Sequence, residues 1–377
     1  MEQEKKPQVV KGFTFNTVEL PVIKEKFGKE WIYFGGDNLF PNFTIELYNK
    51  SAINRRCIQA KADSLVGQGL TTVDPTQAYT IKWANPYETW NSVFEKNALD
   101  FSLHNGFALN VIWSNDAETI AEVYALDFSK VRCGHSGEDD QIHEYWYSFD
   151  WTNPRKWKPQ RFKAFSQEEA KRGLAEGEDG CLSQILYVKG YAPQQFYYPL
   201  PDYIGSYNDI QLDISVSEFH LSNISNGLTP SMWINVPTGD PGDEGKREFY
   251  QEIDSTFAGQ KNAGRFFFTF SEGAELKPEI TPLASVNDNY YLQVDERITS
   301  RILTGHGITS PLLLGIRTGS SGLGNNKDEI LIAWEHFEYT VIRPMKKVML
   351  GEYQKILKWK GYPEIELAII PNKLFAE

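Results

Sequence analysis

A glycine-rich segment near the C-terminal end has the residue types of a phosphate-binding loop. Gly319 and Gly324 bracket four residues, which is the spacing of the two glycines in a Walker A motif. That motif continues with Lys and then Ser or Thr, but Asn325 and Asn326 occupy those two positions. The glycines also miss the Gly-x-Gly-x-x-Gly spacing of dinucleotide-binding folds. We therefore interpret the segment as an exposed working loop and not as a nucleotide site.

Histidine, cysteine and paired carboxylates are the other groups from which a catalytic or metal site is usually built. The six histidines lack His-Glu-x-x-His or any other zinc spacing, and Cys133-Gly134-His135 has no further ligand nearby in the sequence. The run Glu138-Asp139-Asp140 is typical of an exposed turn and not of acid–base catalysis. The sequence therefore predicts no catalytic residue, no metal and no cofactor. The histidines are His104, His135, His143, His220, His306 and His336.

Composition limits the remaining function classes. The 377 residues are 41% hydrophobic, which is enough for two or three packed units, and no apolar run is long enough to span a membrane. Cys57, Cys133 and Cys181 are far apart, which predicts buried, reduced thiols. The opening residues, Met1 to Lys6, do not resemble a secretory signal. A net charge of −12 argues against a protein that wraps DNA, but not against one past which DNA slides.

Hydrophobic periodicity indicates an α+β first half over about residues 40–200. A helix is expected from Pro41 to Leu65, ended by Gly67, and another from Trp83 to Leu103. The pattern then changes to strands, and the charged stretch 150–180 has no clear period. The expected strands cover residues 107–113, 120–124, 131–133, 145–149 and 185–188.

The second half is mostly helical. Helices are expected over 203–225 and 287–303, and between them a β-α-β unit with strands at 232–236 and 265–270 around a helix at 246–257. A final helix over 328–358 would be roughly 45 Å long. Pro344 should kink it, because proline has no amide donor and crowds the carbonyl group of Thr340.

This order of elements resembles a tailed-bacteriophage portal protein over about residues 36–358. The residues that carry the resemblance are Asn226-Gly227, Asn262-Ala263-Gly264-Arg265, Glu272-Gly273 with Lys277-Pro278, and Gly307-Ile308 through Pro311-Leu312-Leu313-Leu314-Gly315. The resemblance implies an α+β, portal-like fold, with a mixed α/β wing, two stem helices, a small β-α-β clip and a long kinked C-terminal helix.

The resemblance also implies a function and a division of the chain. Portal subunits form a ring, expected here to be dodecameric, through which double-stranded DNA passes non-specifically during genome packaging and ejection at the capsid vertex of the virion. The implied partners are the terminase motor, the major capsid protein and head-tail adaptor proteins, with assembly in the host cytoplasm, no membrane and no enzymatic activity. The implied parts are an N-terminal extension (1–35), wing (36–202), stem helix (203–227), clip (228–285), second stem helix (286–308), tunnel loop (309–327), long wing helix (328–360) and a short tail (361–377).

Two sets of residues are the candidate DNA-facing positions. Asp209, Asp213 and Asp295 would form an acidic wall that keeps DNA centred in the channel. The tunnel loop would contact the duplex lightly and without sequence preference. Its candidate residues are Arg317, Thr318, Gly319, Ser320, Ser321, Gly322, Gly324, Asn325, Asn326 and Lys327.

Each of these interpretations has an alternative. The glycine-rich loop is also compatible with a plain surface connection, and Asp209 with Asp213 is also typical of a solvated helix face. The cluster of Trp146, Trp151 and Trp157 is interpreted as core or subunit-contact packing rather than base stacking. Another phage head-tail connector ring is the alternative function. A metal-dependent nucleic-acid enzyme is the other, because carboxylates distant in sequence can meet in a fold.

Overall fold

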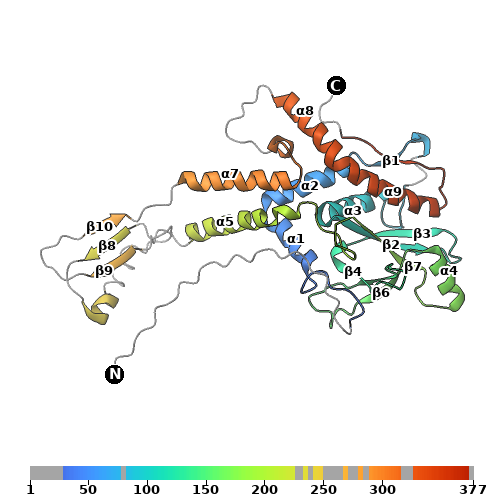
Figure 1. The fold of residues 1–377 in the computed structure, drawn as a ribbon, viewed down its shortest axis with the longest axis horizontal. Coiled ribbons are helices and arrows are strands. Elements are labelled where there is room, and N and C mark those ends of the chain that lie inside the picture. Colours follow the sequence, from blue (N-terminus) through green and yellow to red (C-terminus); the bar gives the residue numbers. More distant parts are fainter. Residues whose placement is uncertain are drawn as a thin grey trace. The chain divides into compact units, whose positions relative to one another are not determined.

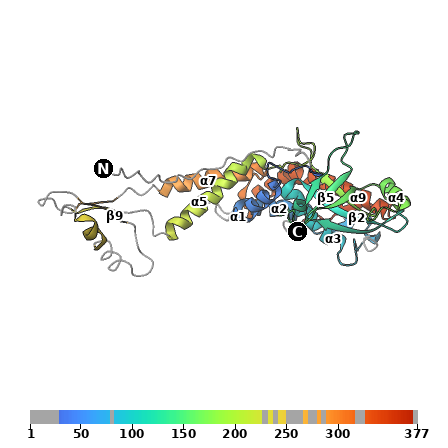
Figure 2. The same cartoon turned by 90° about the horizontal axis from the view of Figure 1, so that it is seen from below.

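The computed structural model divides into two compact units, shown from two directions in Figures 1 and 2. Unit 1 contains the chain up to Asn208 and again from Gly305, and unit 2 spans Asp209–Thr304. Each unit combines helices with a sheet of its own, so the predicted α+β class is confirmed. The structure describes residues 29–77, 82–225, 232–236, 241–248, 266–270, 279–282, 288–315 and 326–372.

A six-stranded sheet forms the centre of unit 1. Its strand order is β3-β2-β7-β6-β5-β4, and every neighbouring pair is antiparallel except β6 with β7. The five strands expected from the sequence are all present, because each alternates or is continuously apolar. The strands are β2 (Gly106–Trp113), β3 (Ile120–Leu126), β4 (Val131–Cys133), β5 (Glu144–Tyr147), β6 (Gln160–Ala164) and β7 (Ser183–Lys189).

The stretch 150–180 contains two elements that the sequence did not predict. Strand β6 has two exposed residues followed by three partly buried ones, so it shows no alternation of buried and exposed positions. Helix α4 (Gln167–Glu176) buries only Ala170 and Gly173, so it has no apolar stripe. Its start is nevertheless marked locally, because the hydroxyl of Ser166 accepts a hydrogen bond from the amide of Glu169 at 3.3 Å.

The helix expected from Pro41 to Leu65 is in fact two helices, α1 (Phe40–Lys50) and α2 (Ala52–Val66). Ser51 between them is extended, and its hydroxyl accepts a hydrogen bond from the amide of Asn54 at 3.1 Å, which caps α2. Apolar periodicity continues across this break, so it gave no sign of the interruption. As expected, α2 ends at Gly67, whose φ of 60° lies in the left-handed region.

Helix α3 (Trp90–His104) begins seven residues later than the predicted Trp83. Thr89 caps it by accepting a hydrogen bond from the amide of Ser92 at 3.2 Å, and Trp83 instead forms an isolated β-bridge with Thr89. Helices α3 and α9 (Arg343–Trp359) cover one face of the sheet. Tyr353 of α9 lies at the centre of this layer, where its hydroxyl accepts a hydrogen bond from Asn97 at 2.8 Å.

The single helix expected over 328–358 is interrupted. It consists of α8 (Asn326–Phe337), a π-helical segment (Glu338–Ile342) and α9. In the π-helical segment the amide of Arg343 donates to the carbonyl group of Glu338, five residues earlier. Pro344 follows directly, so the departure from α-helical geometry lies where its missing amide predicts a disturbance.

Residues before the first helix and near the C-terminus complete unit 1. The amide of Ile32 donates to the carbonyl group of Cys133 at 2.8 Å, and Trp31 bridges Gly134, so residues 31–34 lie along the edge strand β4. Near the other terminus, β11 (Leu367–Ile369) pairs with β1 (Leu70–Thr72) in an antiparallel, two-stranded sheet. The sequence predicted neither pairing, because the paired segments lie far apart along the chain and no local pattern connects them.

Arg132 anchors the segment before α1 and is fully buried. Its guanidinium group donates to the side-chain and main-chain oxygens of Asn38, both at 2.7 Å, and to the carbonyl groups of Ser129 and Val131 at 2.7 and 2.8 Å. All four acceptors are uncharged. Burial therefore lowers the pKa of Arg132 to about 10.

Unit 2 contains α5 (Tyr207–Ser225), α7 (Asp288–Gly305) and a three-stranded sheet of order β10-β8-β9. The predicted strands are present as β8 (Met232–Val236) and β9 (Phe266–Phe270), and they are parallel, as a β-α-β unit requires. The helix expected from Lys246 begins earlier, at residue 242, and is described to 248. Strand β10 (Glu279–Pro282), which was not predicted, pairs antiparallel with β8.

Candidate functional site

Helices α5 and α7 carry the acidic residues expected to line a channel. Their sequences contain six acidic side chains and two basic ones, so the pair carries a net negative charge. Asp209 and Asp213 are four residues apart on α5, so they lie on one face of that helix. Asp295 is on α7 and exposed.

Asp209 forms an ion pair, which reduces the negative charge that it can present to a channel. The guanidinium group of Arg301 in α7 lies 3.4 Å from the Asp209 carboxylate, which is only 17% exposed. Arg301 therefore neutralises part of the charge that Asp209 was expected to present, and it joins α5 to α7 where the two helices lie side by side (Figures 1 and 2). Asp213 is partly buried, so Asp295 is the most exposed of the three predicted carboxylates.

The chain leaves unit 1 and returns to it at two adjacent points, next to Asn208 and Gly305. The ring of Tyr203 stacks on the ring of His306 with centroids 4.3 Å apart, and its hydroxyl donates to the carbonyl group of Leu103 at 2.9 Å. Gly305 contacts Ser206 so closely that a Cβ on the glycine would lie 1.7 Å from the Ser206 hydroxyl oxygen. These contacts, all within unit 1, hold together the two points at which the chain leaves and re-enters it.

Two buried polar side chains from α2 add to these contacts. The Lys61 side chain is fully buried, and its amine lies 2.5 Å from the Asp202 carboxylate and 5.6 Å from the Tyr203 ring centroid. Asn54 accepts a hydrogen bond from Nε2 of His306 at 2.9 Å. Burial, with a smaller contribution from the charge of Lys61, holds the pKa of His306 well below its usual range, so the ring is neutral at pH 7.

Most of the predicted tunnel loop lies outside the described residues. This applies to Arg317, Gly319, Gly324 and the other positions from 316 to 325, whereas Asn326 and Lys327 are the first two residues of α8. On the other side, Pro311–Leu314 form a 3₁₀ turn that ends at Gly315, with a φ of 73°. Arg56 of α2 holds this turn by donating to the carbonyl group of Leu314 at 3.3 Å.

The other chemical candidates remain apart in the structure. No group of three or more His, Cys, Asp or Glu side chains with the geometry of a metal site occurs among the described residues. The three cysteines are buried thiols, as predicted, and burial raises the pKa of both Cys57 and Cys133 to about 12. Glu138, Asp139 and Asp140 lie in an exposed turn, also as predicted. Within the described part of the chain, no helix is both long and apolar enough to span a membrane.

The tryptophan cluster packs inside unit 1. Trp146 and Trp151 lie 5.7 and 5.3 Å from Trp31, centroid to centroid, and all three are buried. The guanidinium group of Arg132 lies 4.9 Å from the Trp151 ring, so cluster and buried arginine form one layer. Trp157, by contrast, is partly exposed and contacts Phe149. The packing interpretation holds for Trp146 and Trp151, and Trp31 takes the place given to Trp157.

No family model matches this sequence, and neither does any curated protein. Several solved structures, in contrast, are similar to this chain. A chain in the neck of an empty gene transfer agent (GTA) particle, computed with C6 symmetry, superposes with a TM-score of 0.60 at 16% identity and covers 89% of this chain and 86% of its own. A chain in the neck of the native particle, computed with C12 symmetry, gives 0.57 at 16% identity over 87% and 83%. An HK97-family phage portal protein from Corynebacterium diphtheriae gives 0.45 at 9% identity over 86% and 95%.

This chain has the fold of a particle-neck protein. The α+β class expected from the sequence is therefore confirmed, and the match to these neck chains extends over most of both chains. The likeness concerns the fold. At 16% identity it transfers no residue role, so Asp209, Asp213, Asp295 and the tunnel loop remain predictions.

Proposed function

We propose that this chain is a phage portal subunit, which forms a ring at the capsid vertex through which double-stranded DNA is packaged and ejected. The observation that carries the proposal is the fold shared with a neck chain over nearly the whole of both, in an assembly computed with twelvefold symmetry. In the proposed ring, unit 1 is the wing, α5 and α7 are stem helices, and the small sheet with its helix is the clip. The clip receives terminase and later the head-tail adaptors, and the wing contacts the major capsid protein.

The charge distribution supports a conduit rather than a DNA-binding enzyme. Tight DNA binding arises when Lys and Arg neutralise phosphates, and it would hold the genome in place. This chain instead carries a net charge of −12, and its two proposed stem helices are acidic. In a ring these charges add, so a duplex on the axis is repelled from every side. Terminase, an ATP-driven motor, supplies the mechanical work, and the ring itself performs no chemical reaction.

The proposal is tested by the size and shape of the purified assembly. We expect mass photometry to give a particle of about twelve times the subunit mass, and negative-stain images along its axis to show a central pore wide enough for a duplex. A ring without a pore, or a protein that stays monomeric at every concentration tested, contradicts the proposed function.

A second candidate is another connector ring of the head-tail junction. It is favoured by the descriptions of the matched assemblies, which name the neck and not a particular component. Binding distinguishes the two candidates, because a portal binds terminase directly whereas an adaptor binds only the finished portal ring. Pull-down of purified terminase by this protein supports the portal, and its absence, with binding to a portal ring, supports the adaptor.

Removing the acidic wall should make the ring retain DNA. We predict that the triple variant Asp209→Asn, Asp213→Asn, Asp295→Asn still forms rings but binds linear duplex DNA at least about tenfold more tightly at 50 mM salt, with the gain lost near 200 mM. Arg301 contributes to this effect, since the variant removes one acidic partner of its guanidinium group. Mobility shift of the purified ring with duplex DNA measures it.

The matched control removes the same charge elsewhere. Glu138→Gln, Asp139→Asn and Asp140→Asn neutralise three carboxylates in an exposed turn of unit 1. We expect this control to leave DNA retention unchanged. If both triple variants gain the same affinity for DNA, the effect depends on net charge alone, and the three aspartates do not face the channel.

A further inference from the structure

Two exposed apolar surfaces lie apart along the helical rod formed by α8, the π-helical segment and α9, one on its N-terminal half and one next to its C-terminal end. The first, here the α8 face, is built on Ile332 and Tyr339, which are 68% and 67% exposed. They are seven residues apart, so they lie on the same side of the rod. An open groove of about 700 Å³ runs between them, and the Arg343 guanidinium lies 5.2 Å from the Tyr339 ring.

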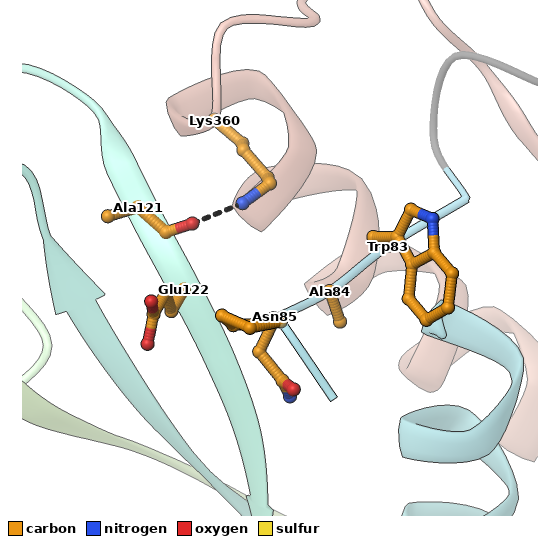
Figure 3. A pocket seen from close by; sticks show the side chains of 7 residues that line it. Trp83, Ala84, Asn85, Ala121, Glu122 and Lys360 are labelled. Atoms are coloured by element: carbon orange, nitrogen blue, oxygen red, sulfur yellow. Dashed lines mark hydrogen bonds between the residues drawn. The ribbon is translucent and has the colours of Figure 1, made fainter. Parts of the chain in front are cut away.

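The second surface, here the Trp83 face, lies where α9 ends. Trp83 and Tyr87 are 54% and 82% exposed, and Trp83 lines an open groove with Lys360, the residue after α9 (Figure 3). Tyr339 and Lys360 are 21 positions apart along the rod, which corresponds to roughly 30 Å. One copy of the chain therefore cannot bring its own two surfaces together.

At the Trp83 face, outward main-chain groups of the neighbouring strand β3 are already hydrogen-bonded within the chain. Strand β3 is an edge of the six-stranded sheet, but Lys360 donates to the carbonyl group of Ala121 at 2.5 Å, as Figure 3 shows. The amide of Val123 donates to the carbonyl group of Ala84 at 3.1 Å, and the side-chain amide of Asn85 donates to the carbonyl group of Val123 at 2.8 Å. With these main-chain groups satisfied, side-chain contact is the mode of docking that this edge offers.

The two surfaces differ in charge. Three exposed carboxylates, Asp328, Glu329 and Glu335, accompany Ile332 on α8 and outnumber the guanidinium group of Arg343 beside Tyr339. Around Trp83 the amines are prominent: that of Lys82 lies 5.4 Å from the Trp83 ring, and Lys360 lines the groove. The Glu122 carboxylate in the same groove accepts a hydrogen bond from the hydroxyl of Tyr124 at 2.7 Å. An acidic apolar surface and an amine-bearing aromatic surface are complementary partners.

We propose that the α8 face of one subunit docks on the Trp83 face of the next. A ring is built from a heterologous contact, which requires two unlike surfaces on every subunit, and this chain has two such surfaces well apart along one run of helix. The partner is a second copy of this chain, and the inference rests on the ring proposed above. Tyr339, Ile332, Trp83 and Tyr87 are the anchors, since large apolar side chains supply most of the energy of such contacts.

The test uses two variants that each lose one surface. Ile332→Asp with Tyr339→Asp removes the α8 face, and Trp83→Asp with Tyr87→Asp removes the Trp83 face. All four side chains are exposed, so both variants are expected to fold, and circular dichroism checks this. We expect each variant alone to be monomeric by mass photometry. Mixed together they should form dimers and nothing larger, because one intact surface of each kind remains.

Each outcome decides a separate question. Rings formed by either double variant overturn the docking proposal and leave the portal function standing. Wild-type protein that is monomeric overturns the ring itself. Monomers that fail to dimerise on mixing also overturn the pairing, since the two intact surfaces then do not recognise one another. Tyr191→Asp is the matched control: Tyr191 is 90% exposed and belongs to neither surface, so its variant should form rings like the wild type.

Discussion

Replacing Arg132 by Ala is expected to lower the free energy of unfolding of unit 1 by about 4 kcal/mol. The guanidinium group satisfies three carbonyl groups and the Asn38 amide oxygen, all inside the protein. Truncation removes the guanidinium donor from all four acceptors, although the amide of Phe34 still donates to the Asn38 side chain at 3.0 Å. Each acceptor left without a donor and out of reach of water costs about 1–3 kcal/mol, and a cavity opens beside Trp151. Thermal unfolding of the purified protein, followed by tryptophan fluorescence, measures the loss.

Variants at positions 132 and 38 show whether the stability contributed by Arg132 depends on the shape of its guanidinium group or only on its charge. Arg132→Lys keeps the charge but not the planar group that reaches several acceptors at once, so we expect it to lose about 2 kcal/mol or more. Asn38→Ala should also destabilise, because Asn38 has a φ of 69°, a conformation that alanine adopts poorly. Asn38→Asp retains both the acceptor oxygen and the tolerance of this φ, so its free energy of unfolding should lie within about 1 kcal/mol of that of the wild type. An Arg132→Lys variant as stable as wild type contradicts the account.

Elements with a strong hydrophobic period could be predicted from the sequence alone. Strand β2 and helix α7 lie within a few residues of their expected bounds, because β2 is almost entirely buried and α7 buries Ile298 and Ile302, four residues apart. Helix α5 also lies close to its expected range, although Tyr207 and Ile210 are the only buried side chains among those described in it. Helix α4 and strand β6 bury little, so the same signal is absent from them. The break at Ser51 was missed for a different reason. Its mark is a capping hydroxyl, which hydrophobic periodicity does not register.

Long-range polar contacts were beyond sequence reasoning. Asp209 pairs with Arg301, 92 residues away, and Lys61 with Asp202, 141 residues away, and no local pattern connects either pair. The acidic wall was therefore expected without the arginine that partly neutralises it. Arg132 did leave a signal, because it is a lone charged residue between apolar neighbours in a short strand. Such a residue must be either exposed or fully hydrogen-bonded, and the structure shows the second.

Gly305→Ala should destabilise the contact between the start of α5 and the end of α7 by about 2–3 kcal/mol. Gly305 is the last residue of α7 and does not have a positive φ, so its small size, not its conformational freedom, is what the site requires. A Cβ there would lie 1.7 Å from the hydroxyl oxygen and 2.8 Å from the Cβ of Ser206. Rotating the hydroxyl relieves the first clash but not the second, so the backbones before α5 and after α7 must separate. Thermal unfolding measures the effect.

The sign of the change in the free energy of unfolding is diagnostic, because replacing glycine by alanine within a helix normally stabilises a protein by about 0.5–1 kcal/mol. Gly351→Ala in α9 is the matched control: no atom lies within 4 Å of the added Cβ, so a small gain is expected. Ser206→Gly combined with Gly305→Ala should recover most of the loss, which gives a coupling energy of about 2 kcal/mol in a double-mutant cycle. Absence of coupling would mean that the two backbones do not meet here. Because the chain crosses between its two units at these residues, we expect uncompensated Gly305→Ala also to lower the yield of closed rings.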